Sequence, residues 1–173
     1  MFINPSNYVQ RPALVSVKDV PADLMIKELA KYLRENVPQV KPPEWALFVK
    51  TGANKDRLPM QDDWWYVRAA AILRKIYLNG PVGIGSLRMA FSYRAKVGPR
   101  TRSERTRKAG GAIIRNILHQ LETAGLVTKA KEGRVLTPQG RALLDKLATN
   151  ILKDLAKQRP ELNKYLTPKT PSE

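Results

Sequence analysis

The stretch "LETAGLVTKAKEGRVLTPQGRALL", residues 121–144, holds three local structural signals in a fixed order. Gly125 follows an apolar helical segment, where glycine commonly ends a helix. Two short runs rich in β-branched residues then flank a turn at residues 132–133, which predicts a β-hairpin. Thr137 and Pro138 suit the cap and first position of a new helix. The stretch therefore predicts a helix, a hairpin and a second helix.

The helix before the hairpin is predicted from "GGAIIRNILHQLETAGLV", residues 110–127. Apolar residues recur on one face at helical spacing, at Ile114, Ile117, Leu118 and Leu121. Leu126 is placed to contact Leu121 just after the glycine, as in a Schellman motif. The helix after the hairpin carries a similar stripe of Leu144, Leu147, Ile151 and Leu155.

Further upstream, "DDWWYVRAAAILRKIYLNGPVGIGSLR", residues 62–88, begins as an apolar helix. Asp62 or Asp63 can cap it, and the face that we expect to be buried carries Trp65, Ala69, Ile72 and Ile76. Asn79 and Gly80 end it, an extended segment follows, and Ser86 is expected to cap a brief second helix.

The three glycines at 80, 83 and 85 could belong to a phosphate-binding loop or to a turn between helices. A dinucleotide motif requires glycines directly after a strand of a parallel sheet, and here they follow a helix. The GKS or GKT sequence of a P-loop is also absent. The glycines therefore indicate turn chemistry.

A helix, an extended segment, a short helix, a longer helix and a hairpin follow one another in the order of a winged helix-turn-helix. Two further helices are predicted, one at residues 21–36 and the one after the hairpin. Between the helix at 21–36 and the apolar helix that begins near residue 62, residues 38–61 form a proline-rich connector. We expect this connector to pack Trp45 and Phe48 inward. The predicted fold is mainly α, a single winged helix-turn-helix-like domain with a small β-hairpin wing and extra helices. Its predicted limits are an N-terminal arm at 1–18, the domain at 19–158 and a C-terminal tail at 159–173.

The charge of the chain points to a polyanionic partner. The 173 residues include 31 Lys and Arg against 15 Asp and Glu, a formal charge of +16 with a pI near 10.3. A charge of this size favours nucleic acid or an anionic membrane surface. A membrane span needs about 20 consecutive apolar residues, and no such run is present. The start of the chain does not resemble a signal peptide, and the absence of cysteine agrees with a reducing compartment.

Several longer motifs resemble one known family. "WWYVRAAAILRKIYLNGPVGIGSLR" and "GGAIIRNILHQLETAGLV" are closely similar to the archaeal and eukaryotic-type family of small-subunit ribosomal protein nineteen. "VKDVPAD" at 17–23, "PEW" at 43–45 and "LTPQG" at 136–140 extend the likeness. The resemblance implies a helical, winged-helix-like protein of the cytoplasmic ribosome. It implies binding to ribosomal RNA in the head of the small subunit, with ribosomal proteins as neighbours, and a role in subunit maturation.

Candidate RNA-binding residues concentrate in the run 94–108, which has seven basic residues and one acidic residue. Arginine suits this role because it binds phosphate through two hydrogen bonds and stacks on bases. We expect Gly110 and Gly111, after the run, to let phosphate approach the amides of the next helix. The seven candidates of the run are Arg94, Lys96, Arg100, Arg102, Arg105, Arg107 and Lys108.

Other candidates lie on helices. Arg68, which matches an arginine of the family's motif, lies among apolar residues and needs a carboxylate or a phosphate as partner, and either remains open. Arg74, Lys75 and Arg115 are further candidates, and the wing adds Lys129, Lys131 and Arg134. His119, where family members commonly have glutamine, is either an exposed helix residue or an RNA contact.

Two other functional classes are less consistent with the sequence. A winged-helix transcription regulator that binds DNA would need a recognition helix with base-reading side chains, and the helix at 110–125 is rich in isoleucine and leucine. An enzyme is not expected, because a single histidine and no cysteine leave no nucleophilic triad or metal cluster. No cofactor and no small-molecule substrate are expected.

Overall fold

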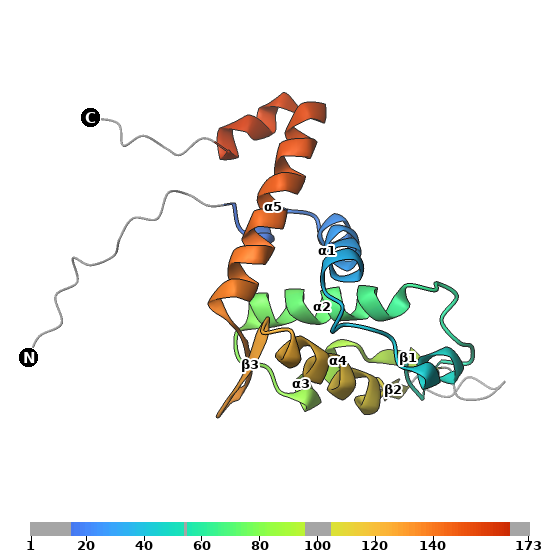
Figure 1. Cartoon of the computed structure of the whole chain (residues 1–173). Coiled ribbons are helices and arrows are strands. Elements are labelled where there is room, and N and C mark those ends of the chain that lie inside the picture. Colours follow the sequence, from blue (N-terminus) through green and yellow to red (C-terminus); the bar gives the residue numbers. More distant parts are fainter. Residues whose placement is uncertain (1–14, 54, 96–104, 167–173) are drawn as a thin grey trace, which may run out of the picture.

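The computed structural model describes residues 15–53, 55–95 and 105–166, and in this part of the chain the predicted mainly α, winged-helix-like fold is confirmed (Figure 1). Its α-helices are α1 (Ala22–Asn36), α2 (Trp64–Asn79), α3 (Ile84–Ala90), α4 (Gly111–Thr123) and α5 (Pro138–Gln158). Its strands form two antiparallel pairs, β1 (Tyr93–Ala95) with β2 (Arg105–Arg107) and β3 (Val127–Ala130) with β4 (Gly133–Leu136). Short 3₁₀ turns are η2 (Val17–Asp19), η3 (Glu44–Phe48) and η4 (Pro160–Tyr165).

The core is built around α2. In Figure 1, α2 runs across the middle of the molecule, with α1 and α5 above it and α3 and α4 below it. The predicted inward face of α2 is buried at Trp65, Ala69, Ile72 and Ile76. The indole Nε1 of Trp65 donates to Oε1 of Gln120 at 2.9 Å, and Nε2 of Gln120 donates to the carbonyl of Lys41 at 2.6 Å. This pair of hydrogen bonds ties α2, α4 and the connector together.

Glycine ends two of the helices in the positive-φ conformation that other residues avoid. Gly80 after α2 and Gly125 after α4 both have φ of 72°. The amide of Leu126 donates to the carbonyl of Leu121 at 3.1 Å, and the amide of Gly125 donates to that of Glu122 at 3.0 Å. These two bonds confirm the Schellman motif. The expected Ser86 cap is wrong, because α3 already begins at Ile84, after Gly83.

The predicted wing is the β3–β4 hairpin. Val127 pairs with Leu136 and Ala130 with Gly133, so the turn residues are 131–132, one position before the prediction. Gly133 has φ of 145°, and a Cβ atom there would lie 2.7 Å from the carbonyl carbon of Val82. The extended segment after α2 thus packs directly on the wing, where it forms an isolated bridge to Arg134.

Three expectations about less regular segments are corrected. Val15 and Val17 are buried, so the last residues of the predicted arm pack with the helices. After Pro160 the chain forms η4, and Leu162 packs against the core, so this part of the predicted tail is folded. Phe48 is 79% exposed, and the residue that η3 buries is Ala46. In a 3₁₀ turn these two residues point in different directions.

Candidate nucleic-acid interface

The described ends of the basic run form two paired antiparallel strands. β1 pairs with β2 through Tyr93 with Arg107, Arg94 with Thr106 and Ala95 with Arg105. Arg107 and the following Lys108 are exposed. For Arg94 and Arg105 the structure describes the backbone, and Lys96, Arg100 and Arg102 lie outside the described residues. We use the name hairpin base for Tyr93–Ala95 and Arg105–Lys108.

The hairpin base is held by the rest of the fold. The amide of Ala109 donates to the carbonyl of Arg88 at 3.1 Å, and Nε of Arg88 donates to the carbonyl of Ala109 at the same distance. The amide of Gly110 donates to the carbonyl of Thr51 at 2.9 Å. Arg107 and Lys108 therefore extend from a backbone that is fixed on two sides, which lowers the entropy lost when they bind a ligand.

We expected Gly110 and Gly111 to let phosphate approach the amides of α4, but protein atoms lie close to both glycines. The Gly110 amide is already bonded to Thr51, and a Cβ atom at Gly110 would lie 3.2 Å from that carbonyl oxygen. A Cβ atom at Gly111 would lie 3.3 Å from the side chain of Arg88. Both glycines allow close packing within the protein.

Arg68 is partly buried, and no carboxylate of the described residues forms an ion pair with it. Its guanidinium carbon lies 4.5 Å from the centre of the Phe91 ring, just before β1. Burial lowers the pKa of Arg68 below the usual range of an arginine. In the described part of the chain the ion pairs are Arg134 with Glu122 and Lys157 with Asp154, so no carboxylate neutralises Arg68. The sequence left a carboxylate or a phosphate as the partner of Arg68, and no carboxylate of the described residues takes that role.

The other helical candidates lie apart from Arg68. Arg74 and Lys75 follow it on α2 by about 9 to 11 Å of helix rise, toward the wing. The Nε of Arg74 is buried and has no hydrogen-bond acceptor among the described residues. Arg115 is exposed on α4, one turn after the Gly111 on which Arg88 packs. The structure thus brings Arg68 close to the hairpin base and places Arg74 and Lys75 elsewhere.

The wing contributes less positive charge than its sequence suggests. The Nε of Arg134 donates to Oε1 of Glu122 at 3.1 Å, and both side chains are mostly buried. This ion pair neutralises Arg134 within the fold. Lys129 and Lys131 are exposed.

Sequence reasoning missed Lys55, Arg57 and Arg88. The Nζ of Lys55 lies 4.0 Å from the centre of the Tyr93 ring, next to the hairpin base. Arg88 bonds to the segment that follows β2. No local pattern marks Lys55 or Arg88, because each lies far along the chain from the residue that it contacts.

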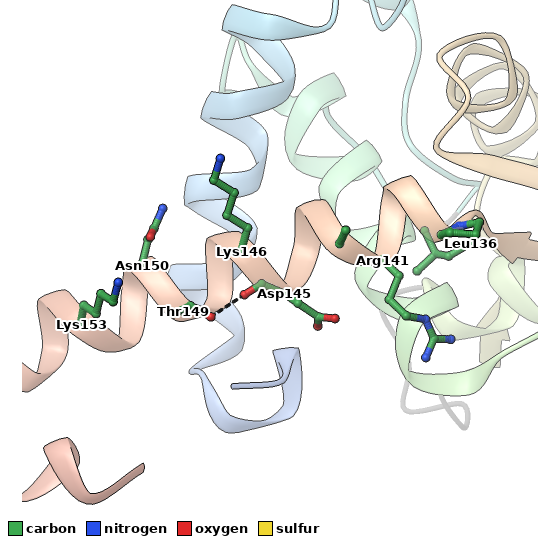
Figure 2. Close-up of a pocket in the computed structure, with 9 residues that line it drawn as sticks. Leu136, Arg141, Asp145, Lys146, Thr149, Asn150 and Lys153 are labelled. Atoms are coloured by element: carbon green, nitrogen blue, oxygen red, sulfur yellow. Dashed lines mark hydrogen bonds between the residues drawn. The ribbon is translucent and has the colours of Figure 1, made fainter. Parts of the chain in front are cut away.

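A second surface with basic side chains lies along α5 (Figure 2). Lys146 and Lys153 are exposed, and Arg141 lies with its guanidinium carbon 5.5 Å from the centre of the Tyr77 ring. The Tyr77 hydroxyl donates to Oδ1 of Asp145 at 2.6 Å. This surface therefore carries a carboxylate among its cations, unlike the hairpin base, whose residues are basic, aromatic or small.

His119 is exposed on α4, and its backbone carbonyl accepts a hydrogen bond from Thr123 at 3.0 Å. Among the described residues, no three His, Asp or Glu side chains come together in a way that could hold a metal ion. None of the helices in the same part of the chain is both long enough and apolar enough to cross a membrane.

Residues 16–154 match the family Ribosomal protein S19e. A relative named small ribosomal subunit protein eS19, from Aeropyrum pernix, is 51% identical over 155 residues, covering 88% of this chain and 100% of the relative. A protein of the same name from Haloarcula marismortui is 39% identical, covering 88% of this chain and 99% of the relative.

A eukaryotic relative extends the comparison. The small ribosomal subunit protein eS19 of Entamoeba histolytica is 42% identical over 141 residues, covering 80% of this chain and 88% of the relative. The matched region includes all the helices and strands from α1 to β4. The chain belongs to the ribosomal protein S19e family.

Proposed function

We propose that this protein is a structural, non-enzymatic constituent of the small ribosomal subunit in the cytoplasm. It binds ribosomal RNA in the head of the subunit, contacts neighbouring ribosomal proteins and supports maturation of the subunit. The names of the relatives, all small-subunit proteins, support this proposal. The structural observation that carries it is a hairpin base with exposed Arg107 and Lys108, next to an Arg68 that no carboxylate neutralises among the described residues.

The proposed mode of binding follows from the charge of RNA. Each phosphate that a Lys or Arg contacts releases condensed counterions, so affinity rises with the number of contacts and falls with salt. Because the backbone that carries the cations is fixed, the protein favours an RNA whose phosphates match the positions of those cations, and not any RNA of the same charge. The proposed contacts are Arg68, Arg74, Lys75, Arg94, Lys96, Arg100, Arg102, Arg105, Arg107, Lys108 and Arg115.

The alternative of a DNA-binding transcription regulator finds little support. In a winged helix-turn-helix, α4 occupies the place of the recognition helix. Arg115 is its only Lys or Arg, and its inner face is buried at Ile113, Ile114, Ile117, Leu118 and Leu121. The relatives that we compared are all named as ribosomal proteins.

The proposal is tested by measuring binding of the full chain to fragments of small-subunit ribosomal RNA over a range of salt concentrations. We expect the logarithm of the affinity to fall with the logarithm of salt, with a slope of roughly 0.7 to 0.9 per phosphate contacted. In cells the protein should co-sediment with small subunits, and its loss should reduce small subunits alone. A flat salt response, or a free dimer that binds duplex DNA more tightly than RNA, would contradict the proposal.

A further inference from the structure

A recess of about 640 Å³ lies between α2, the segment before it and the end of α3. Three cations line it, Lys55 and Arg57 from the segment and Arg68 from α2. No Asp or Glu is among the described residues that line it. The described lining therefore carries cations and no carboxylate, and a concave surface with charge of one sign attracts anions more strongly than a flat one.

Aromatic rings give the recess flat walls. Trp64 and Phe91 both line it, and Arg68 lies over the Phe91 ring at 4.5 Å. Trp64 is held against the buried Trp65, with ring centres 5.3 Å apart and an interplanar angle of 76°. Each ring is thus fixed by a packed neighbour. Fixed aromatic walls can bind a planar ring with little loss of conformational entropy.

The recess continues into the hairpin base. Lys55 lies 4.0 Å from the centre of the Tyr93 ring, and Tyr93 pairs with Arg107 across β1 and β2. Arg107 therefore lies on the strand next to the residue that Lys55 of the recess contacts. Gln61, also on the lining, adds an amide that can both donate and accept hydrogen bonds.

We infer that this recess binds an unpaired nucleotide of the RNA bound at the hairpin base. The phosphate contacts Lys55 and Arg57, the base packs against Trp64 and Phe91, and Gln61 reads the edge of the base. A nucleotide combines the two features that the lining selects, an anion and a planar ring. A base inside a duplex is stacked on both faces and cannot enter. The inference rests on the proposed function, because it adds a nucleotide site to the proposed RNA interface.

The test uses the full chain and two RNAs, a short duplex and the same duplex with one bulged 4-thiouridine. We expect the bulged RNA to bind roughly tenfold more tightly, because stacking of one base on aromatic side chains contributes that much. Irradiation should cross-link the bulged base to Trp64, Phe91 or Tyr93, as mapped by mass spectrometry. Equal affinity for the two RNAs, with cross-links elsewhere, would overturn the inference.

A filled recess gives the decisive variant. Ala71 lines the recess, and Ala71→Phe occupies it without removing any cation. This variant should lose the preference for the bulge and keep its affinity for the plain duplex. The matched control is Ala142→Phe on α5, where the alanine is exposed and lines the other surface. It should keep the preference, and a preference that survives in Ala71→Phe with a normal melting curve would overturn the inference.

The remaining outcomes also separate the proposals. If Ala71→Phe does not fold, the cross-link position in the unmodified protein decides the question. If the protein binds neither RNA, the proposed function itself fails. If it binds the plain duplex with a steep salt dependence but shows no preference for the bulge, only the nucleotide site fails. Tight binding of an acidic peptide with an aromatic residue, lost in Ala71→Phe, would assign the recess to a protein partner and overturn the inference.

Discussion

Reversing two charges at the hairpin base should weaken RNA binding without unfolding the protein. Arg107 and Lys108 are exposed and belong to no ion pair among the described residues. Substituting both with glutamate should therefore change the free energy of unfolding by about 0.5 kcal/mol or less. If each contacts one phosphate, the slope of log affinity against log salt should fall by about 1.4 to 1.8. Fluorescence anisotropy with labelled RNA at several salt concentrations measures the slope, and melting curves by circular dichroism measure the stability.

A matched control separates local contacts from total charge. Lys146→Glu with Lys153→Glu makes the same change in net charge, from +16 to +12 in both double variants. These two lysines are exposed on α5 (Figure 2), which Figure 1 shows well away from β1 and β2. We expect the control to keep a slope close to that of the unchanged protein. If both double variants lose the same affinity and slope, binding depends on bulk charge, and the assignment of the hairpin base is wrong.

Three further predictions concern the fold. Leu121→Ala should lower the free energy of unfolding by about 2 to 5 kcal/mol in urea denaturation, because this leucine is fully buried and its truncation leaves a cavity; a loss below about 1 kcal/mol would contradict its place in the core. Gln120→Leu should cost about 1 to 3 kcal/mol, since the buried Trp65 Nε1 loses its acceptor at 2.9 Å. Trp65→Phe should then lower the free energy of unfolding less in the Gln120→Leu variant than in the parent protein. If the effects of the two substitutions simply add, the Trp65–Gln120 hydrogen bond does not contribute to stability. Burial and the hydrogen bond to Asp145 raise the pKa of Tyr77 above its ordinary value of 10.0. The neutral Tyr77 hydroxyl therefore stabilises the folded protein below pH 10, and this contribution is lost as pH rises through the pKa of the folded state. Tyr77→Phe should therefore lose less stability than the parent in alkaline melts, and parallel pH profiles would contradict the role of this hydroxyl.

The sequence by itself predicted the elements whose signals act over a few residues. Gly125 and Leu126 form the predicted Schellman motif, and Thr137 caps α5 by accepting from the Gly140 amide at 3.1 Å. The buried faces of α2 and α4 follow their apolar periodicity. These features depend on turn chemistry and helical spacing, which are contained in a short stretch of chain. Longer motifs were enough to predict the family as well.

Other features depended on which segments meet in space. The β1–β2 hairpin was missed because a run of charged residues lacks the apolar alternation that marks a strand. Phe48 was expected to be buried because it is large and apolar, yet η3 turns Ala46 to the core. The sequence shows that a residue is apolar, and the packing of neighbouring elements decides whether it is covered.

The charges of the interface were decided in the same way. Arg134 and Arg68 both have apolar neighbours in the sequence. Nothing in the local sequence shows which of the two arginines is neutralised by a carboxylate. The tertiary structure places Glu122 beside Arg134, which neutralises it, and places Phe91 beneath Arg68, which leaves its charge without a counterion among the described residues. The field at a charged group depends on all nearby charges whatever their position in the chain. The sequence therefore determined how much positive charge the protein carries, and the fold determined which of those charges are neutralised within the protein.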